Sequence, residues 1–477
     1  MNAPLRRVAI SVLVLFTLLI VNVNYIQVVR SDELRKDPSN TRQLVEEYDR
    51  ERGSIVVAGN EVALSKKTDD RLTYLRQYPD AELYAPVTGY YSLTYGKTGI
   101  EEAENDLLSG TDPRLVFRRI ADLFTGRDPA GGNVELTLDP AVQKAAMDGL
   151  KGVTGAVVAL DPKTGAILGL ASTPSFDPNQ LSSHDPKAIR AYREQLSDDQ
   201  TTNQAINQRY SPGSVFKVVV SAAALATGKY TPQTPIPAPD KLTLPGTNTT
   251  LENFNGESCN GGADQPLIDA LTISCNTAFA QLGIDLGEQK IRDMATAFGI
   301  DEQGFEMPLE VAPSKLGDIE NDAQLGVTSI GQQDVQLTPM QAAMIAAAVA
   351  NKGRLMKPYL VSQVQAPDLT VIDKTDPEEM SQAVSPEVAG QLTEMMTSVV
   401  NNGTGKRARI DGVQVAGKTG TAENAGQDHS WFIGFAPADD PKIAVAVFVR
   451  NGGKTGGDIS APVAKSVIQA YLNGQGG

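Results

Sequence analysis

The sequence predicts an α/β (α+β) protein with an N-terminal membrane helix, a small first domain and a larger second domain. One apolar run fills residues 8–29, residues 30–135 mix short strands and loops with a short helical stretch, and from residue 136 long apolar helices alternate with strands. A chain of 477 residues is long enough for two or three domains. We therefore expect a cytoplasmic tail at 1–7, a membrane anchor at 8–29, a small domain at 30–135 and a main domain at 136–477.

The apolar run, "VAISVLVLFTLLIVNVNYIQVV", is preceded by Arg6 and Arg7. About 20 such residues span a bilayer as a helix, and the arginines place its N-terminus in the cytoplasm. A cleaved signal peptide is the alternative, but no small-x-small cleavage site follows the run. We expect an uncleaved signal-anchor in the cell membrane, with the chain after Arg30 outside the cytoplasm. A buried helix of a soluble domain fits such a run poorly.

Composition excludes several classes of function. A net charge of −15 argues against nucleic acid as a partner, because phosphate binding needs clustered Lys and Arg. With only two His and two Cys residues, we expect no metal site and no cofactor. A Ser-His-Asp triad is not expected either, because no G-x-S-x-G occurs, and His429 is interpreted as a strand-start residue.

The expected elements of the main domain begin with a strand that contains Val134 and continue with a helix capped by Asp139 ahead of Pro140. The tripeptide Lys-Thr-Gly occurs four times, and the surroundings of each copy indicate the element in which it lies. The Lys163 copy lies in a β-hairpin turn, and the Lys454 copy in "RNGGKTGGDIS", which we interpret as a mobile linker before a helix. The copy at Lys97 precedes the main domain.

Ser-x-x-Lys occurs once, in "SPGSVFK", as Ser214 and Lys217. The following "SVFKVVVSAAALATG" predicts an apolar helix that ends at Gly228. Residues i and i+3 share a helix face, and an amine among Val and Phe side chains loses hydration, which lowers its pKa and lets it act as a base. About one such motif is expected by chance, so a capping serine with a snorkelling lysine is the structural alternative.

Ser-x-Asn occurs twice, at Ser258 and at Ser274. The first copy lies in a glycine-rich loop, whereas the second is embedded in a helical pattern. A hydroxyl that must reach a catalytic lysine needs a rigid mount, so we choose Ser274 and Asn276.

The remaining Lys-Thr-Gly copy continues the strand of "VQVAGKTGTAE". Its glycines at 417 and 420 allow a ligand backbone to approach the strand, Lys418 offers a fixed positive charge to a carboxylate, and Thr419 and Thr421 offer hydroxyl donors. Ser-x-x-Lys, Ser-x-Asn and Lys-Thr-Gly follow here in the order used by serine acyl-transfer enzymes that react with penicillin.

These signatures and their surroundings resemble the penicillin-binding transpeptidases over about residues 130–475. The likeness includes the long stretches "VVALDPKTGAILGLASTPSFDPN", "TSIGQQDVQLTPMQAAMIAAAVANKGRLMKPYLV" and "VAGKTGTAE…WFIGFAP". "NTRQLVEEYDRERGSIV" and "YGKTGIEEAEN" resemble the non-catalytic pedestal, or dimerisation, domain of the class B, monofunctional members, most closely the short actinobacterial type. That likeness puts Lys97 in the pedestal. A bifunctional class A member would need a glycosyltransferase domain, for which there is no room before residue 135.

The resemblance implies a fold and a reaction. The fold is an antiparallel sheet flanked by helices. In the reaction, Ser214 attacks the penultimate D-alanine carbonyl of a peptidoglycan stem peptide, Lys217 takes its proton, and Ser274 relays a proton to the leaving amine. An amine of a neighbouring strand then accepts the acyl group, and β-lactams acylate the same serine.

The other site residues are also assigned by the resemblance. Backbone N–H groups of Ser214 and Thr421 would form the oxyanion hole, and Asn276 would hold the network around the lysine. Lys418, Thr419, Gly420 and Thr421 would bind the terminal carboxylate. Division or elongation proteins of the membrane are the expected partners.

Three other functions remain open. A D,D-carboxypeptidase or endopeptidase uses the same residues with water as acceptor, and a division scaffold could keep an acylable serine without turnover. A β-lactamase is not favoured, because the deacylating glutamate of an E-x-x-L-N motif does not follow Ser274.

The two cysteines, Cys259 and Cys275, would both lie on the oxidising side of the membrane, where an even count favours a bridge. They are 16 residues apart in the sequence, and a loop of that size would contribute roughly 3 kcal/mol in the chain-entropy model. The bridge would also restrain Ser274. The alternative is two free thiols, because spacing alone does not fix geometry.

Overall fold

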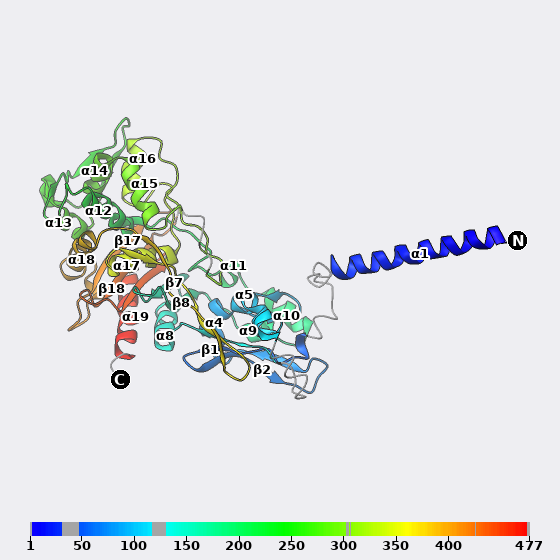
Figure 1. The fold of residues 1–477 in the computed structure, drawn as a ribbon. Helices are drawn as coiled ribbons and strands as arrows, with labels where there is room; N and C mark the ends of the chain where they lie inside the picture. The colour runs from blue at the N-terminus through cyan, green and yellow to red at the C-terminus, as the bar shows by residue number, and fades with distance from the viewer. Residues whose placement is uncertain are drawn as a thin grey trace.

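A computed structural model describes residues 2–30, 47–116, 130–301, 305, 307–424 and 426–474; the expected first part of the pedestal, residues 31–46, lies outside these ranges. Helix α1 (Asn2–Val28) stands apart from the rest of the protein in Figure 1. Its segment Arg6–Val28 is exposed, and by length and composition it can cross a membrane. Polar side chains within it are satisfied locally: Ser11, Thr17 and Asn24 each donate to the carbonyl four residues earlier.

The pedestal is built on a mixed sheet to which the C-terminal half of the chain also contributes. The strand order is β15-β14-β6-β1-β2-β3, with β1 and β6 parallel. Strands β14 (Val361–Gln365) and β15 (Val371–Lys374) join it from more than 200 residues downstream, so the two expected domains share one sheet. The other elements of this part are β1 (Ile55–Val57), β2 (Asn60–Lys67), β3 (Tyr74–Gln77), α4 (Ala81–Thr88), β4 (Tyr91–Ser92), β5 (Gly96–Lys97), α5 (Ile100–Ala103), α6 (Asn105–Leu108) and β6 (Asn133–Leu136).

A buried ionic cluster ties the pedestal together. The Glu101 carboxylate accepts from Arg52 Nε and Arg76 Nε, each at 2.6 Å, and from the Tyr78 hydroxyl at 3.1 Å. Burial raises the pKa of Glu101, but the two guanidinium groups outweigh burial and lower this pKa below its usual value. Lys97 pairs with Glu47 at 3.1 Å in the same region, so this Lys-Thr-Gly copy lies in the pedestal as expected.

The main domain contains a five-stranded antiparallel sheet in the order β17-β18-β19-β7-β8. Helices α8 and α19 pack on one face and α17 on the other, so the strands are apolar on both sides. Along β19, Val445 and Val447 join the α8–α19 core, whereas Ala446 and Phe448 join the core that includes α17. These elements are α8 (Pro140–Gly149), β7 (Gly155–Leu160), β8 (Ile167–Thr173), α17 (Pro339–Ala350), β17 (Ala416–Ala422), β18 (His429–Ala436), β19 (Ile443–Val449) and α19 (Ser460–Gly474).

A group of helices beside β17 completes the main domain (Figure 1). Its members are α12 (Lys217–Ala226), α13 (Leu267–Ile273), α14 (Asn276–Leu286), α15 (Glu288–Ala297), α16 (Asp322–Ser329) and α18 (Pro386–Asn401). Helix α18 packs on β17 and on α13, and so connects the sheet to the helices. The shorter elements are α9 (Pro178–Leu181), α10 (Pro186–Arg193), α11 (Asp198–Thr201), and the strand pairs β9 (Pro235–Ile236) with β12 (Gln265–Pro266), β10 (Lys241–Thr243) with β11 (Thr250–Glu252), and β13 (Arg354–Met356) with β16 (Glu379–Gln382).

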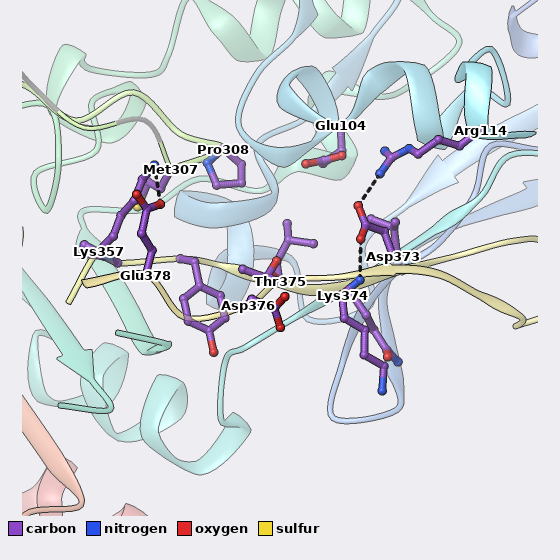
Figure 2. Close-up of a pocket in the computed structure, with 15 residues that line it drawn as sticks. Glu104, Arg114, Met307, Pro308, Lys357, Asp373, Lys374, Thr375, Asp376 and Glu378 are labelled. Atoms are coloured by element: carbon purple, nitrogen blue, oxygen red, sulfur yellow. Dashed lines mark hydrogen bonds and ion pairs between the residues drawn. The ribbon is translucent and has the colours of Figure 1, made fainter. Parts of the chain in front are cut away.

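A cavity of about 290 Å³ lies between the pedestal and the β14–β15 hairpin. Figure 2 shows the residues that line it. Arg114 reaches across to Asp373 at 3.1 Å, and Lys357 pairs with Glu378 at 3.5 Å. Its lining, within the described residues, contains none of the signature side chains. The cavity is therefore separate from the site that the sequence predicts.

Candidate functional site

Ser214 lies in a 3₁₀ turn (Gly213–Phe216) that leads into α12. The α-helix starts at Lys217, three residues later than the pattern predicted. Gly213 has φ of 53° and its N–H donates to Gly331 O at 2.9 Å; a Cβ on Gly213 would lie 2.3 Å from Thr421 O. Glycine is therefore required at 213, and it brings the backbone before Ser214 against the strand that carries the third signature.

The Lys217 amine is buried at the centre of the site. Its Nζ donates to Asn276 Oδ1 at 2.7 Å, to Ser274 O at 2.8 Å and to Ser274 Oγ at 3.4 Å. These described hydrogen bonds go to the second signature and not to Ser214 Oγ. Burial, and secondarily the charge of Lys418, hold the pKa of Lys217 well below its usual value. The amine can therefore be neutral and act as a base.

Ser274 is not inside a helix, which corrects the expectation of a helical mount. It follows the last residue of α13 with φ of 65° and ψ of 41°, the left-handed region, and α14 begins two residues later. This conformation costs a non-glycine residue about 1–2 kcal/mol. It also lets both the carbonyl and the hydroxyl of Ser274 contact Lys217.

Lys418 also contacts Ser274. Its buried Nζ donates to Ser274 Oγ at 2.9 Å and to Thr419 O at 2.8 Å. Burial lowers the pKa of Lys418 to about 7. A fixed positive charge on Lys418 was expected from the sequence, but with this pKa the charge changes near neutral pH. The three signatures thus meet at the Ser274 hydroxyl, which lies within 3.4 Å of both amines.

Strand β17 is an edge strand of the sheet, so one side of its backbone is not paired with a neighbouring strand. A Cβ on Gly420 would lie 2.9 Å from Pro212 O, so glycine allows the strand to approach the serine turn. The Thr419 hydroxyl contacts the Thr404 hydroxyl at 2.5 Å. Thr404 belongs to no signature, and sequence reasoning missed it.

The loop that carries Lys454 packs against this strand, which corrects its interpretation as a mobile linker. A Cβ on Gly456 would lie 2.0 Å from Trp431 O and 2.4 Å from Gly420 O. Ser430 Oγ donates to the Lys454 carbonyl, and Thr455 Oγ1 donates to Asp458 at 2.7 Å. Its glycines allow close packing, and a helix does follow the loop as expected, because α19 begins at Ser460.

The alternative copies lie elsewhere. Ser258 donates to Asp240 at 2.5 Å in an exposed loop, and Lys163 pairs with Asp440 at 2.8 Å in the β7–β8 turn. His429 is the first residue of β18, as expected, and packs edge-on against Tyr210 and Phe448.

Cys259 and Cys275 form a disulfide, with their Cα atoms 6.1 Å apart. The bridge joins the loop before β12 to the residue between Ser274 and Asn276. The middle signature is therefore attached covalently to that loop.

Comparisons with known proteins identify the family. The protein-family model of the penicillin-binding protein transpeptidase domain matches residues 155–469. The family model of the penicillin-binding protein A dimerisation domain matches residues 52–134. The chain is 48% identical to the peptidoglycan D,D-transpeptidase PbpA of Mycolicibacterium smegmatis over 490 residues, 99% of each chain. It is 48% identical to PbpA of Mycobacterium tuberculosis over 493 residues, with both chains fully covered. The penicillin G acyl-enzyme structure of M. tuberculosis penicillin-binding protein A is similar, with a TM-score of 0.86, 47% identity, and coverage of 89% of this chain and 100% of that one.

Proposed function

This chain belongs to the penicillin-binding transpeptidases, as a class B, monofunctional member, and from that premise we propose that it cross-links peptidoglycan as a serine D,D-transpeptidase. The observation that carries the proposal is the position of Ser274 Oγ, which is 3.4 Å from Lys217 Nζ and 2.9 Å from Lys418 Nζ. Such a hydroxyl can pass a proton between a base and a leaving group beside the serine turn.

Acylation begins when Ser214 Oγ attacks the penultimate D-alanine carbonyl of a stem peptide. Lys217 accepts the Ser214 proton, which its lowered pKa permits. The negative charge on the carbonyl oxygen is stabilised by the backbone N–H groups of Ser214 and Thr421. Donors of this kind contribute about 3–4 kcal/mol each to acyl transfer.

Collapse of the tetrahedral intermediate breaks the peptide C–N bond and leaves an ester on Ser214. Ser274 donates its proton to the departing D-alanine amine and is reprotonated by Lys217, which Asn276 holds in place. Lys418 binds the terminal carboxylate together with the hydroxyls of Thr419 and Thr421. Gly420 leaves room for the peptide beside the strand.

In the second transfer, an amine of a neighbouring peptidoglycan strand attacks the ester on Ser214. The amine gives up its proton, which restores the Ser214 hydroxyl, and the new amide bond is the cross-link. Penicillins mimic the D-alanyl-D-alanine donor and acylate Ser214, but their ring remains attached and blocks the acceptor. Peptidoglycan stem peptides and β-lactams are therefore the ligands.

Helix α1 would anchor this activity to the cell membrane, with Arg6 and Arg7 on the cytoplasmic side and the catalytic domain outside. The pedestal would raise the site above the bilayer. Division or elongation proteins in the same membrane are the partners that fit this arrangement.

Hydrolysis by a carboxypeptidase is the competing activity, because it needs the same residues with water as acceptor. Full-length protein in detergent, given a pentapeptide donor and an amine acceptor, distinguishes the two: the proposal predicts that amine-linked product exceeds tetrapeptide. Tetrapeptide alone at saturating acceptor would contradict it.

Muropeptide analysis of cells tests the scaffold alternative. Ser214→Ala should lower the fraction of cross-linked stem peptides, whereas Ser258→Ala, at the exposed first Ser-x-Asn copy, should not. Normal cross-linking in cells that rely on Ser214→Ala would mean that the protein acts as a scaffold.

A further inference from the structure

Helix α14 begins at a place where no local side chain caps it. The first N–H groups of a helix have no partner inside it, and a side-chain oxygen just before the helix usually accepts from them. In this protein the side chains of the two residues before α14, Ser274 and Cys275, make other contacts. Cys275, the N-cap residue, is in the disulfide and makes no capping hydrogen bond in the described chain, and Ser274 Oγ contacts the two lysines.

Asn253 caps the helix from a distance of more than 20 residues along the chain. Its Oδ1 accepts from the backbone N–H of Asn276 at 2.8 Å and of Thr277 at 3.1 Å. The side chain is buried, with 7% of the residue exposed. Its Nδ2 has no hydrogen-bond partner among the described residues, so the oxygen alone makes the contacts of this amide.

The capping loop is fixed at two points around the second signature. Asn253 directly follows β11, which pairs with β10, and six residues later Cys259 is bonded to Cys275. The amide thus holds the N–H of Asn276, and the disulfide holds the residue before it. Asn276 in turn holds Lys217 Nζ at 2.7 Å.

We propose that Asn253 is a positioning residue for acyl transfer: by capping α14 it fixes Asn276 and the left-handed Ser274, and through them the catalytic amine. This rests on the proposed function. The residue does not touch the substrate, and its effect reaches the reaction through Asn276. The loop between β11 and β12 is therefore part of the catalytic framework, although it lies outside the three signatures.

Because Asn253 Nδ2 has no hydrogen-bond partner among the described residues, the nitrogen can be replaced while the capping oxygen is kept. Asn253→Asp keeps an acceptor oxygen and replaces a group without a partner, whereas Asn253→Leu is similar in size and has no acceptor. Phe254→Ala, at the half-exposed neighbour, is the matched control. Benzylpenicillin acylation of the full-length protein is measured as the limiting rate and the non-covalent dissociation constant, together with the melting temperature.

We expect Asn253→Leu to lower the limiting acylation rate by about tenfold, the scale of a lost helix cap, with the dissociation constant within about twofold. Asn253→Asp and Phe254→Ala should keep the rate within about threefold, because the cap remains. A Leu variant with a normal rate, a loss confined to the dissociation constant, or an Asp variant as slow as the Leu variant would overturn the proposal.

If Asn253→Leu does not fold, Asn253→Ala, which also lacks the acceptor, takes its place: a loss of about tenfold beside a near-wild-type Asp variant supports capping, and a normal rate refutes it. Failure of the wild-type protein to be acylated at Ser214 would instead contradict the proposed function. The two failures are thus distinguishable in one data set.

Discussion

Gly456→Ala should impair acylation although Gly456 belongs to none of the three signatures. A Cβ there would lie 2.0 Å from Trp431 O, 2.4 Å from Gly420 O and 3.0 Å from Gly420 N. Ordinary contact begins at 3.4 Å, so the loop must move away by about 1.4 Å from Trp431 O in β18 and by about 1.0 Å from Gly420 O in β17. All three atoms are backbone, and no side-chain rotation relieves the overlap.

Strand β17, which contains Gly420, must move away from the added Cβ. It also carries Lys418, whose Nζ lies 2.9 Å from Ser274 Oγ. A displacement of about 1 Å at a catalytic group lowers rates by roughly 100-fold, and we expect a loss on this scale in the second-order rate constant of acylation. Stopped-flow acylation by a fluorescent penicillin measures it. Gly390→Ala, in α18, is the control, because its Cβ would meet nothing within 4 Å.

The reasoning is refuted if Gly456→Ala is acylated within about threefold of wild type at an unchanged melting temperature. That result would mean that the loop shifts away without moving the strand. The loop would then not position Lys418.

Three further predictions follow from the site. Acylation should rise as pH increases through the pKa of Lys217, because only the neutral amine accepts a proton, and should fall above about pH 7 as Lys418 loses the charge that binds the carboxylate; steady acceleration to about pH 9 would contradict these roles. Thr404→Val should weaken non-covalent penicillin binding by about 3- to 10-fold, and Thr404→Ser should restore it, because the hydroxyl at 2.5 Å orients Thr419; equal behaviour of both variants in binding assays would argue against this. Thiol titration of the denatured, unreduced protein should find no free thiol, since Cys259 and Cys275 are bridged, whereas two thiols per chain would disprove the disulfide.

The parts of this fold that the sequence predicted depend on local patterns. Apolar runs identify the buried strands, and Asp139 does cap α8 by accepting from two backbone N–H groups. The signatures are equally local, because residue type and spacing within a few positions specify them. Their order along the chain sets aside the copies at Lys97 and Lys163, and the strand context favoured Lys418 over Lys454.

What the sequence did not predict depends on contacts between distant segments. Strand β14 pairs with β6 across more than 200 residues, and the residues of β14 do not by themselves predict which strand it pairs with. Ser274 was predicted to be helical because it is embedded in a helical pattern, yet the residue has a left-handed conformation in which its hydroxyl contacts two lysines. Asn253 and Thr404 act through single hydrogen bonds from ordinary loop positions, where composition carries no signal.

The central claim is that Ser214 forms the acyl-enzyme. Peptide mapping by mass spectrometry after incubation of the full-length protein with benzylpenicillin tests it most directly. We predict one adduct per chain, on the peptide that contains Ser214, which decays slowly and is absent in Ser214→Ala. An adduct on another serine, or release of the penicilloyl group as fast as in a β-lactamase, would contradict the account.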